Sequence, residues 1–146
     1  MNKIKPFLIS SFVLAFFLIV CSSVLAKSED YVLPYPSFMP GNKLYQVKET
    51  WDKFKGLFMF GNFTKFSYEL QLADKKLVEA KVLYEYGQIA LGNKALEKYQ
   101  THMMILPKLL AAANKEGKNI SEKERLLKQA LKKHQQVLWE LSQVSP

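Results

Sequence analysis

Cysteine and arginine are the scarcest side chains in this 146-residue chain, and their scarcity excludes several kinds of site. The one cysteine, Cys21, lies in an apolar run near the N-terminus, so residues 27–146 contain none. Disulfides, zinc–thiolate centres and thiol catalysis are therefore excluded from that part of the chain. Arg125 is the only arginine among 21 basic residues, so only one guanidinium group can make paired hydrogen bonds to phosphate or guanine. We expect no nucleic acid among the partners.

Recognisable catalytic arrangements are also missing from the sequence. Enzyme chemistry needs a nucleophile, a base within reach and a group that stabilises charge. The serines, the two histidines and the 13 carboxylates follow no known pattern of that kind. We predict that the protein is not an enzyme, has no catalytic residue and uses no cofactor.

The two histidines are the strongest candidates for ligand binding. His102 precedes Met103 and Met104, and imidazole and thioether groups together can bind Cu(I). Adjacent helical residues diverge by about 100°, so the three side chains cannot all face one ion, and we interpret them as core. His134 is interpreted as a structural histidine bonded to a neighbour. No metal site is assigned, and a metal or small-ligand binding bundle that uses both histidines is kept as the alternative.

Residues 1–26 have the layout of a signal peptide. Lys3 and Lys5 precede fifteen uncharged residues, 7–21, and the small residues Val24 and Ala26 suit a signal peptidase that would cut before residue 27. The mature chain would then carry 19 basic and 13 acidic residues. In this interpretation the folded part is extracytoplasmic, either secreted or periplasmic.

The same segment also fits an N-terminal membrane anchor. Residues 6–26 are 21 uncharged residues, about the 20 that cross a bilayer as a helix. Membrane association through residues 6–26 is therefore the second interpretation, and lipidation at Cys21 is the third. With an uncleaved anchor, as with a cleaved signal, the rest of the chain lies outside the cytoplasm.

Residues 27–41 are predicted to form an extended arm. Three prolines in this short stretch oppose a helix, because each fixes φ and pushes the preceding residue to extended geometry. The apolar side chains between them are too many for a free linker, so we expect the arm to pack either on the chain's own helices or on a partner protein. The predicted interaction residues are Tyr31, Leu33, Pro34, Tyr35, Pro36 and Phe38.

Residues 42–146 change to a helical period and are predicted to form a bundle domain. The first helix carries one apolar face, formed by Leu44, Val47, Trp51, Phe54 and Phe58, and ends at Gly61 and Asn62. The second opens near Thr64 and has the longest seam, formed by Phe66, Leu70, Ala73, Leu77, Ala80, Tyr84, Gly87 and Leu91. Gly92 and Asn93 are read as its stop and the start of the next helix.

Two further helices complete the pattern. The third contains Pro107 and has a seam of Leu96, Tyr99, Met103, Leu106, Leu110 and Ala113. The fourth begins at a capping box of Ser121 and Glu124, and its inward residues are Leu127, Leu131, His134, Leu138 and Leu141. Short connections make sequential helices neighbours, so the sequence predicts an all-α antiparallel bundle of about four helices preceded by the arm.

The formal net charge is +8, and residues 108–146 contain eight basic and four acidic residues. We interpret this excess as a solvated lysine face on the last helix. Contact with anionic lipid headgroups or wall polymers is the alternative.

Several short motifs resemble an uncharacterised family of exported bacterial helical domains, a domain of unknown function. They occur in the arm, in the first two helices and in the last one. The residues concerned are Tyr31, Val32, Leu33, Pro34, Tyr35, Pro36, Pro40, Leu44, Tyr45, Lys48, Leu70, Leu72, Ala73, Lys76, Leu77, Glu79, Ala80, His134, Val137 and Leu138. Segments that look like these occur in the extracytoplasmic parts of some membrane-anchored bacterial regulators that resemble anti-sigma factors.

The resemblance implies an extracytoplasmic location and a helical bundle, and it transfers no activity. Together with the missing catalytic motifs, it favours a protein-interaction or scaffold module of the bacterial cell envelope. The expected partner is a protein at the cell envelope whose identity the sequence does not specify.

Overall fold

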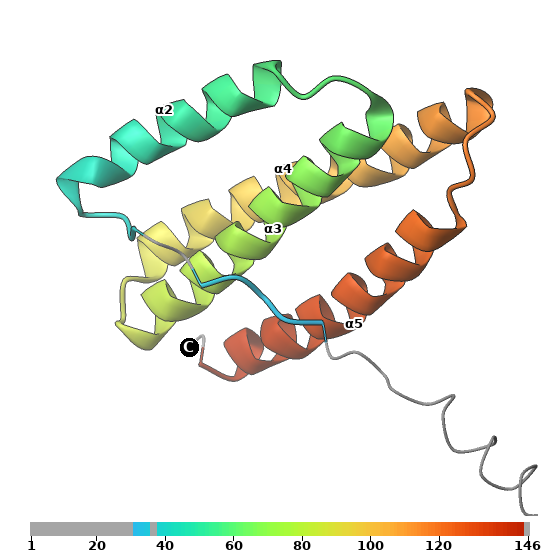
Figure 1. Ribbon diagram of the computed structural model, residues 1–146. Helices are drawn as coiled ribbons and strands as arrows, with labels where there is room; N and C mark the ends of the chain where they lie inside the picture. The colour runs from blue at the N-terminus through green and yellow to red at the C-terminus, as the bar shows by residue number, and fades with distance from the viewer. Residues whose placement is uncertain (1–30, 36–37, 145–146) are drawn as a thin grey trace, which may run out of the picture. The chain divides into compact units, whose positions relative to one another are not determined.

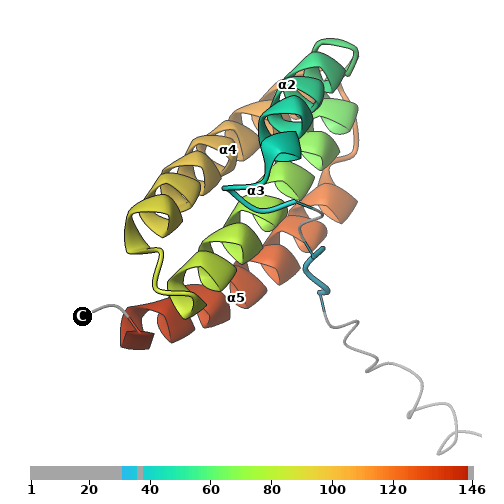
Figure 2. The same ribbon diagram turned by 90° about the vertical axis from the view of Figure 1, so that its left-hand side faces the viewer.

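Every regular element in residues 31–35 and 38–144, which the computed structural model describes, is an α-helix (Figure 1). The helices are α2 (Lys43–Leu57), α3 (Asn62–Glu85), α4 (Ile89–Lys115) and α5 (Ser121–Val144). Sequential helices run in alternating directions (Figures 1 and 2). The predicted all-α antiparallel bundle is therefore confirmed. The signal peptide or anchor predicted for residues 1–26 lies outside the described residues.

Helix α3 is the centre of the core, as its long seam predicts. It packs along α4 and against α5, and its seam side chains up to Tyr84 are all buried, with Phe66 and Leu77 completely so. On α4 the predicted seam residues Tyr99, Leu106 and Leu110 are also buried. Burial of such side chains is the main stabilising contribution to a bundle of this kind.

The break between α3 and α4 lies at Gly87, and the predicted stop at Gly92 and Asn93 is wrong. Gly87 has φ +70°, its N–H donates to the carbonyl of Tyr84 at 2.9 Å, and the Gln88 N–H donates to that of Leu83 at 2.8 Å. This pair of bonds is a Schellman motif, which ends a helix with glycine in the left-handed region. The sequence pattern had counted Gly87 as part of the seam.

Gly92 instead lies inside α4, where it allows a close helix–helix approach. A Cβ at this position would lie 2.6 Å from two ring carbons of Tyr84. The glycine is therefore explained by packing across the α3–α4 turn.

The start of α5 and part of its seam also differ from the prediction. The amide of Ser121 donates to Asn119 Oδ1 at 3.0 Å, so Asn119 takes the bond that the capping box assigned to Glu124. Leu131, predicted to face inward, is 40% exposed, and the buried positions are Ala130, His134, Val137 and Leu141. A small residue such as Ala130 adds little to a hydrophobic pattern, although it fits closely against large neighbours in the core.

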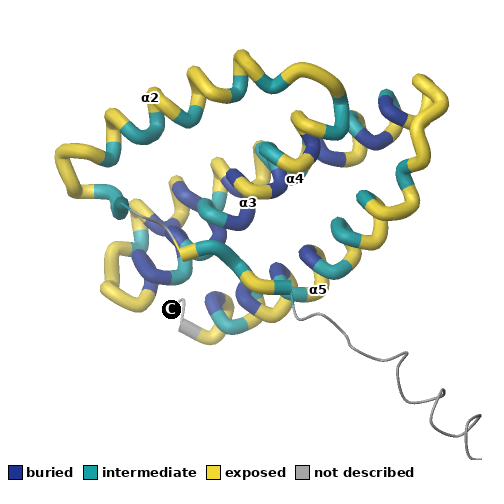
Figure 3. Tube along the Cα trace, in the orientation of Figure 1, coloured by how far each residue is buried: buried dark blue, intermediate teal, exposed yellow. Residues whose placement is uncertain are grey.

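Helix α2 is oriented with its apolar face outward. A helix of a globular protein normally turns its apolar stripe to the core, yet no residue of α2 is buried, and Figure 3 shows no buried segment along it. Its large apolar residues are exposed, as is the cap residue Phe58, and they are Leu44, Val47, Trp51, Phe54 and Leu57. The helix begins where Asn42 Oδ1 accepts from the Leu44 amide at 2.9 Å.

Candidate functional site

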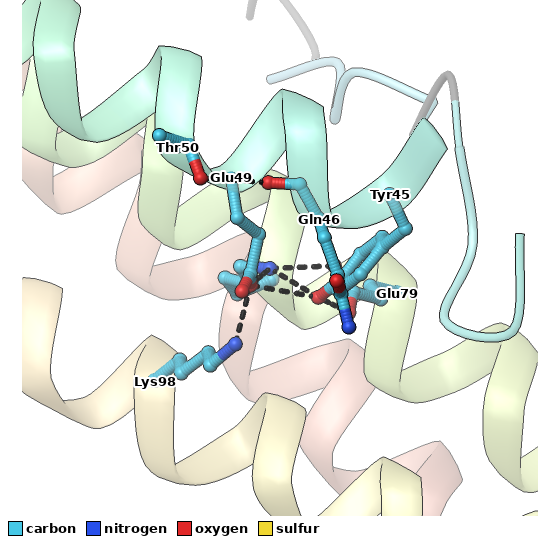
Figure 4. Close-up of polar contacts among 7 residues, drawn as sticks. Tyr45, Gln46, Glu49, Thr50, Glu79 and Lys98 are labelled. Atoms are coloured by element: carbon cyan, nitrogen blue, oxygen red, sulfur yellow. Dashed lines mark hydrogen bonds and ion pairs between the residues drawn. The ribbon is translucent and has the colours of Figure 1, made fainter. Parts of the chain in front are cut away.

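The polar face of α2 is fastened to the bundle by a cluster of charged side chains (Figure 4). Lys76 of α3 lies at its centre, with Nζ 2.9 Å from Glu49 Oε1 of α2 and 2.9 Å from Glu79 Oε2. The hydroxyl of Tyr45 lies 2.5 Å from Glu79 Oε1 and accepts from Lys76 Nζ at 2.7 Å. Lys98 of α4 donates to Glu49. We call these five residues the α2 clamp.

The α2 clamp is electrically balanced, because two lysines face two glutamates. Burial alone would raise the pKa of Glu49, but hydrogen bonds from Lys98, Lys76 and Tyr45 outweigh it and hold that pKa at about 2. Burial, together with the bond to Glu79 and its negative charge, raises the pKa of the Tyr45 hydroxyl far above its usual value. Glu49 is thus held ionised and Tyr45 is held protonated.

A cleft of about 300 Å³ lies beside the clamp, between α2, α3 and α4. Its wall mixes lysines with carboxylates and includes His102, whose Nδ1 lies 2.6 Å from Glu69 Oε2. Glu49 in this cleft pairs with Lys76 and Lys98, and these contacts join α2 to α3 and α4, while Lys48, Lys53 and Lys75 also line the cleft. The clearest role of the cleft is to position α2.

A second polar network lies deeper and joins the arm to three helices. His134 of α5 is 1% exposed, with Nε2 2.7 Å from Asp74 Oδ1 of α3 and Nδ1 3.2 Å from the Tyr99 hydroxyl of α4. The hydroxyl of Tyr31 in the arm donates to Asp74 Oδ2 at 2.5 Å. We call these four residues the arm lock.

The arm lock satisfies each of its members. The tautomer with hydrogen on Nε2 lets His134 donate to Asp74 and accept from Tyr99. Burial and the neighbouring Asp74 raise the pKa of the Tyr31 hydroxyl, so Tyr31 remains a donor. An imidazole beside a carboxylate also occurs in catalytic sites, but here both groups are shielded from solvent. The prediction that His134 is a structural histidine bonded to a neighbour agrees with this geometry.

The predicted arm residues fall into two groups in the structure. Tyr31 and Leu33 point to the bundle, where Leu33 packs against the core cluster of Ala73, Leu77 and Tyr99. Val32 and Tyr35 point away and are 83% and 76% exposed. Pro34 and Phe38 are half-buried, and Phe38 also borders the outer face of α2; Pro36 lies outside the described residues.

Residues 37–146 match the family described as a domain of unknown function (DUF5667). The chain belongs to this family. The expected membership in an uncharacterised family is confirmed, and the DUF5667 match begins after most of the arm. No curated protein and no solved structure is significantly similar to the chain. No described helix of this DUF5667 protein has both the length and the apolar run needed to cross a membrane.

Five of the residues that carried the family resemblance lie in the two networks. Tyr31 and His134 belong to the arm lock, and Tyr45, Lys76 and Glu79 belong to the α2 clamp. Sequence reasoning had noticed these positions but had not assigned them contacts, apart from a bonded His134. Asp74, Glu49 and Lys98 were missed, because isolated charged residues on helices usually face solvent.

The structure does not bring together the ligands of the alternative metal site. His102 pairs with Glu69, whereas His134 pairs with Asp74. Within the described part of the chain no three histidine, cysteine, aspartate or glutamate side chains are placed to share an ion. Met103 packs against the core clusters, whereas Met104 is exposed.

Proposed function

We propose that this DUF5667 protein is an extracytoplasmic protein-interaction or scaffold module of the bacterial cell envelope, without catalytic activity. The main support for the proposal is that the bundle holds the arm in place. Tyr31 and Leu33 attach an extended segment to the bundle, and Val32 and Tyr35 remain exposed on its outer side. An extended segment that is already ordered loses little entropy when a partner binds it.

The exposed arm residues suit a protein partner. Tyr35 offers a large apolar ring with a polar tip, the kind of side chain that is enriched where proteins meet. Rigid aromatic anchors of this type often carry much of the binding energy in an interface. In this proposal Tyr35 and Val32 contact the partner, while the arm lock keeps the segment in place.

Site-specific photocrosslinking in the native cell tests the proposal. A photoreactive phenylalanine analogue at position 35 should give a discrete adduct with one protein. The matched control places it at Tyr86, which is equally exposed but lies at the α3–α4 turn, and should give no such adduct. Val32→Ser should reduce the adduct at position 35.

The same adduct from positions 35 and 86 would show that the crosslink does not report on the arm. Absence of any adduct at position 35, with the protein present at normal levels, would contradict an interaction through the arm. A thermal melt with Cu(I), Cu(II) or Zn(II) tests the alternative, because a ligand that binds only the folded state raises the melting temperature.

A further inference from the structure

The outward face of α2 is a continuous apolar stripe that the described residues leave open. Leu44, Val47, Trp51, Phe54 and Phe58 recur at steps of three and four, so they lie on one side of the helix. Trp51 stacks against Phe54, and Phe54 meets Phe58 edge to face. With Phe38 of the arm, the stripe borders a groove of about 870 Å³.

Charge is distributed unequally around this helix. The only carboxylates of α2, Glu49 and Asp52, line the cleft on the bundle side. Lysines flank the stripe: Lys43 lies one turn before Val47, Lys48 borders both the groove and the cleft, and Lys55 lies over the Trp51 ring at 5.8 Å. The accessible side of α2 is therefore apolar at its centre and positive at its edges.

This composition matches an anionic lipid surface. Helices that lie in a membrane interface place Trp, Phe and Leu toward the acyl chains and lysines toward the headgroups. Each lysine near an anionic leaflet adds about 1 kcal/mol to binding. We propose that the outer face of α2 docks on an anionic lipid bilayer, with Trp51, Phe54 and Phe58 in the interface and Lys43 and Lys55 at the phosphates.

Two other occupants fit the observations less well. A second copy of the chain would bring its own lysines against those of the first, and each chain already carries a formal charge of +8. A protein groove that encloses an amphipathic helix needs access around it, but Tyr45 and Glu49 on the inner side are held by the α2 clamp. A flat lipid surface needs only the outer side.

The test follows the depth of Trp51 in vesicles and uses the full chain. Trp51 and Trp139 are the only tryptophans, so Trp139→Phe leaves Trp51 as the single reporter, and Trp51→Phe leaves Trp139 on α5 as the control. Because residues 6–26 can enter a bilayer by themselves, vesicle binding alone is not the readout. Vesicles of phosphatidylglycerol, with and without brominated acyl chains, are compared with phosphatidylcholine vesicles.

In phosphatidylglycerol vesicles we expect Trp51 emission to move to shorter wavelength and to be quenched by brominated chains, while Trp139 changes in neither respect. Lys43→Gln combined with Lys55→Gln should shift the equilibrium roughly 25-fold toward lipid-free α2, at roughly fivefold for each lysine. The matched control, Lys128→Gln with Lys132→Gln, removes two exposed lysines of α5 and should leave the equilibrium unchanged.

Absence of bromine quenching at Trp51 in phosphatidylglycerol vesicles would overturn the proposal. Equal quenching in phosphatidylcholine, unaffected by the lysine changes, would overturn the role of charge. An emission shift that grows with protein concentration without lipid would identify a second copy as the occupant. Trp51 emission that is already at short wavelength in buffer and insensitive to lipid would show that another part of this chain covers the outer face of α2. None of these outcomes bears on crosslinking through the arm.

Discussion

Asp74, Glu79 and His134 are buried, and each is bonded to a partner from another helix or from the arm. At the residue scale such groups are costly to bury unless hydrogen bonds satisfy them. Among the described residues, no buried side-chain nitrogen or oxygen lacks a partner. Their bonds therefore do more than offset desolvation, since they specify which segments meet.

Tyr31→Phe tests the arm lock at a single atom. The change removes the hydroxyl that donates to Asp74 and leaves that buried carboxylate one donor short. We expect the free energy of unfolding to fall by about 1–3 kcal/mol, the cost of an unsatisfied buried acceptor. Chemical denaturation measures it. Tyr35→Phe, which removes a hydroxyl from an exposed ring, should change stability by less than about 0.5 kcal/mol. Equal effects from the two changes would show that the hydroxyl of Tyr31 does not hold the arm.

Gly92→Ala should destabilise the protein, although alanine normally favours a helix interior by about 0.5–1 kcal/mol. The new Cβ would lie 2.6 Å from the Tyr84 ring, so the ring must move within a packed site. Overpacking of this kind costs about 1–3 kcal/mol. Gly56→Ala is the control, because its Cβ would meet Tyr68 at an ordinary 3.4 Å. A thermal melt that shows Gly92→Ala to be stabilising would mean that Tyr84 does not pack there.

At the scale of the element, α2 differs from the other helices in what attaches it. The packing of α3, α4 and α5 rests on buried apolar side chains, whereas α2 has none and is held by ion pairs and by Tyr68, whose hydroxyl donates to the Asp52 carbonyl. Partly exposed ion pairs contribute less than core burial and weaken with salt. We therefore expect α2 to detach before the rest of the bundle unfolds.

Glu49→Gln tests this attachment through its pH dependence. The pKa of Glu49 is about 2 in the folded protein against an ordinary 4.5. A lowered pKa stabilises the folded state above pH 4.5, and that contribution is lost as the pH falls from about 4.5 to about 2. The wild-type protein should therefore be more stable than Glu49→Gln at pH 7, and the difference should shrink over this window.

Thermal melts of both proteins between pH 2 and pH 7 provide the measurement. Glu97→Gln, an exposed position on α4, is the control and should resemble the wild type within about 0.5 kcal/mol at pH 7. A Glu49→Gln difference that stays constant down to pH 2 would exclude the ion pairs with Lys76 and Lys98 as its source.

At the scale of the whole molecule, export is the prediction that the described residues leave to experiment. A reporter that is active only outside the cytoplasm, fused after Pro146, should be active because residues 1–26 carry a signal-peptide layout. A silent reporter on a stable fusion would refute export. Mass spectrometry of the protein then separates cleavage before Lys27 from retention of residues 6–26 as an anchor.

Much of the bundle follows from local pattern. The four helices and the seams of α3 and α4 were predictable, because the spacing of Leu70, Leu77 and Leu106 among polar residues permits one buried face. The α3–α4 break was not, because Gly87 and Gly92 give the same signal in a sequence. The Schellman bonds at Gly87 and the Tyr84 ring beside Gly92 distinguish them, and both depend on the folded chain.

The sequence by itself determined that α2 is amphipathic, and only the tertiary structure decided which of its faces meets the bundle. The helical period of the apolar residues identifies a polar and an apolar face, and it predicts that the apolar face meets the core. In the folded protein the polar face is the inner one, because Tyr45 and Glu49 find Glu79, Lys76 and Lys98 there, partners that lie 27 to 49 residues along the chain. Contacts across such separations depend on how α3 and α4 pack, and that packing also leaves the apolar stripe of α2 facing outward.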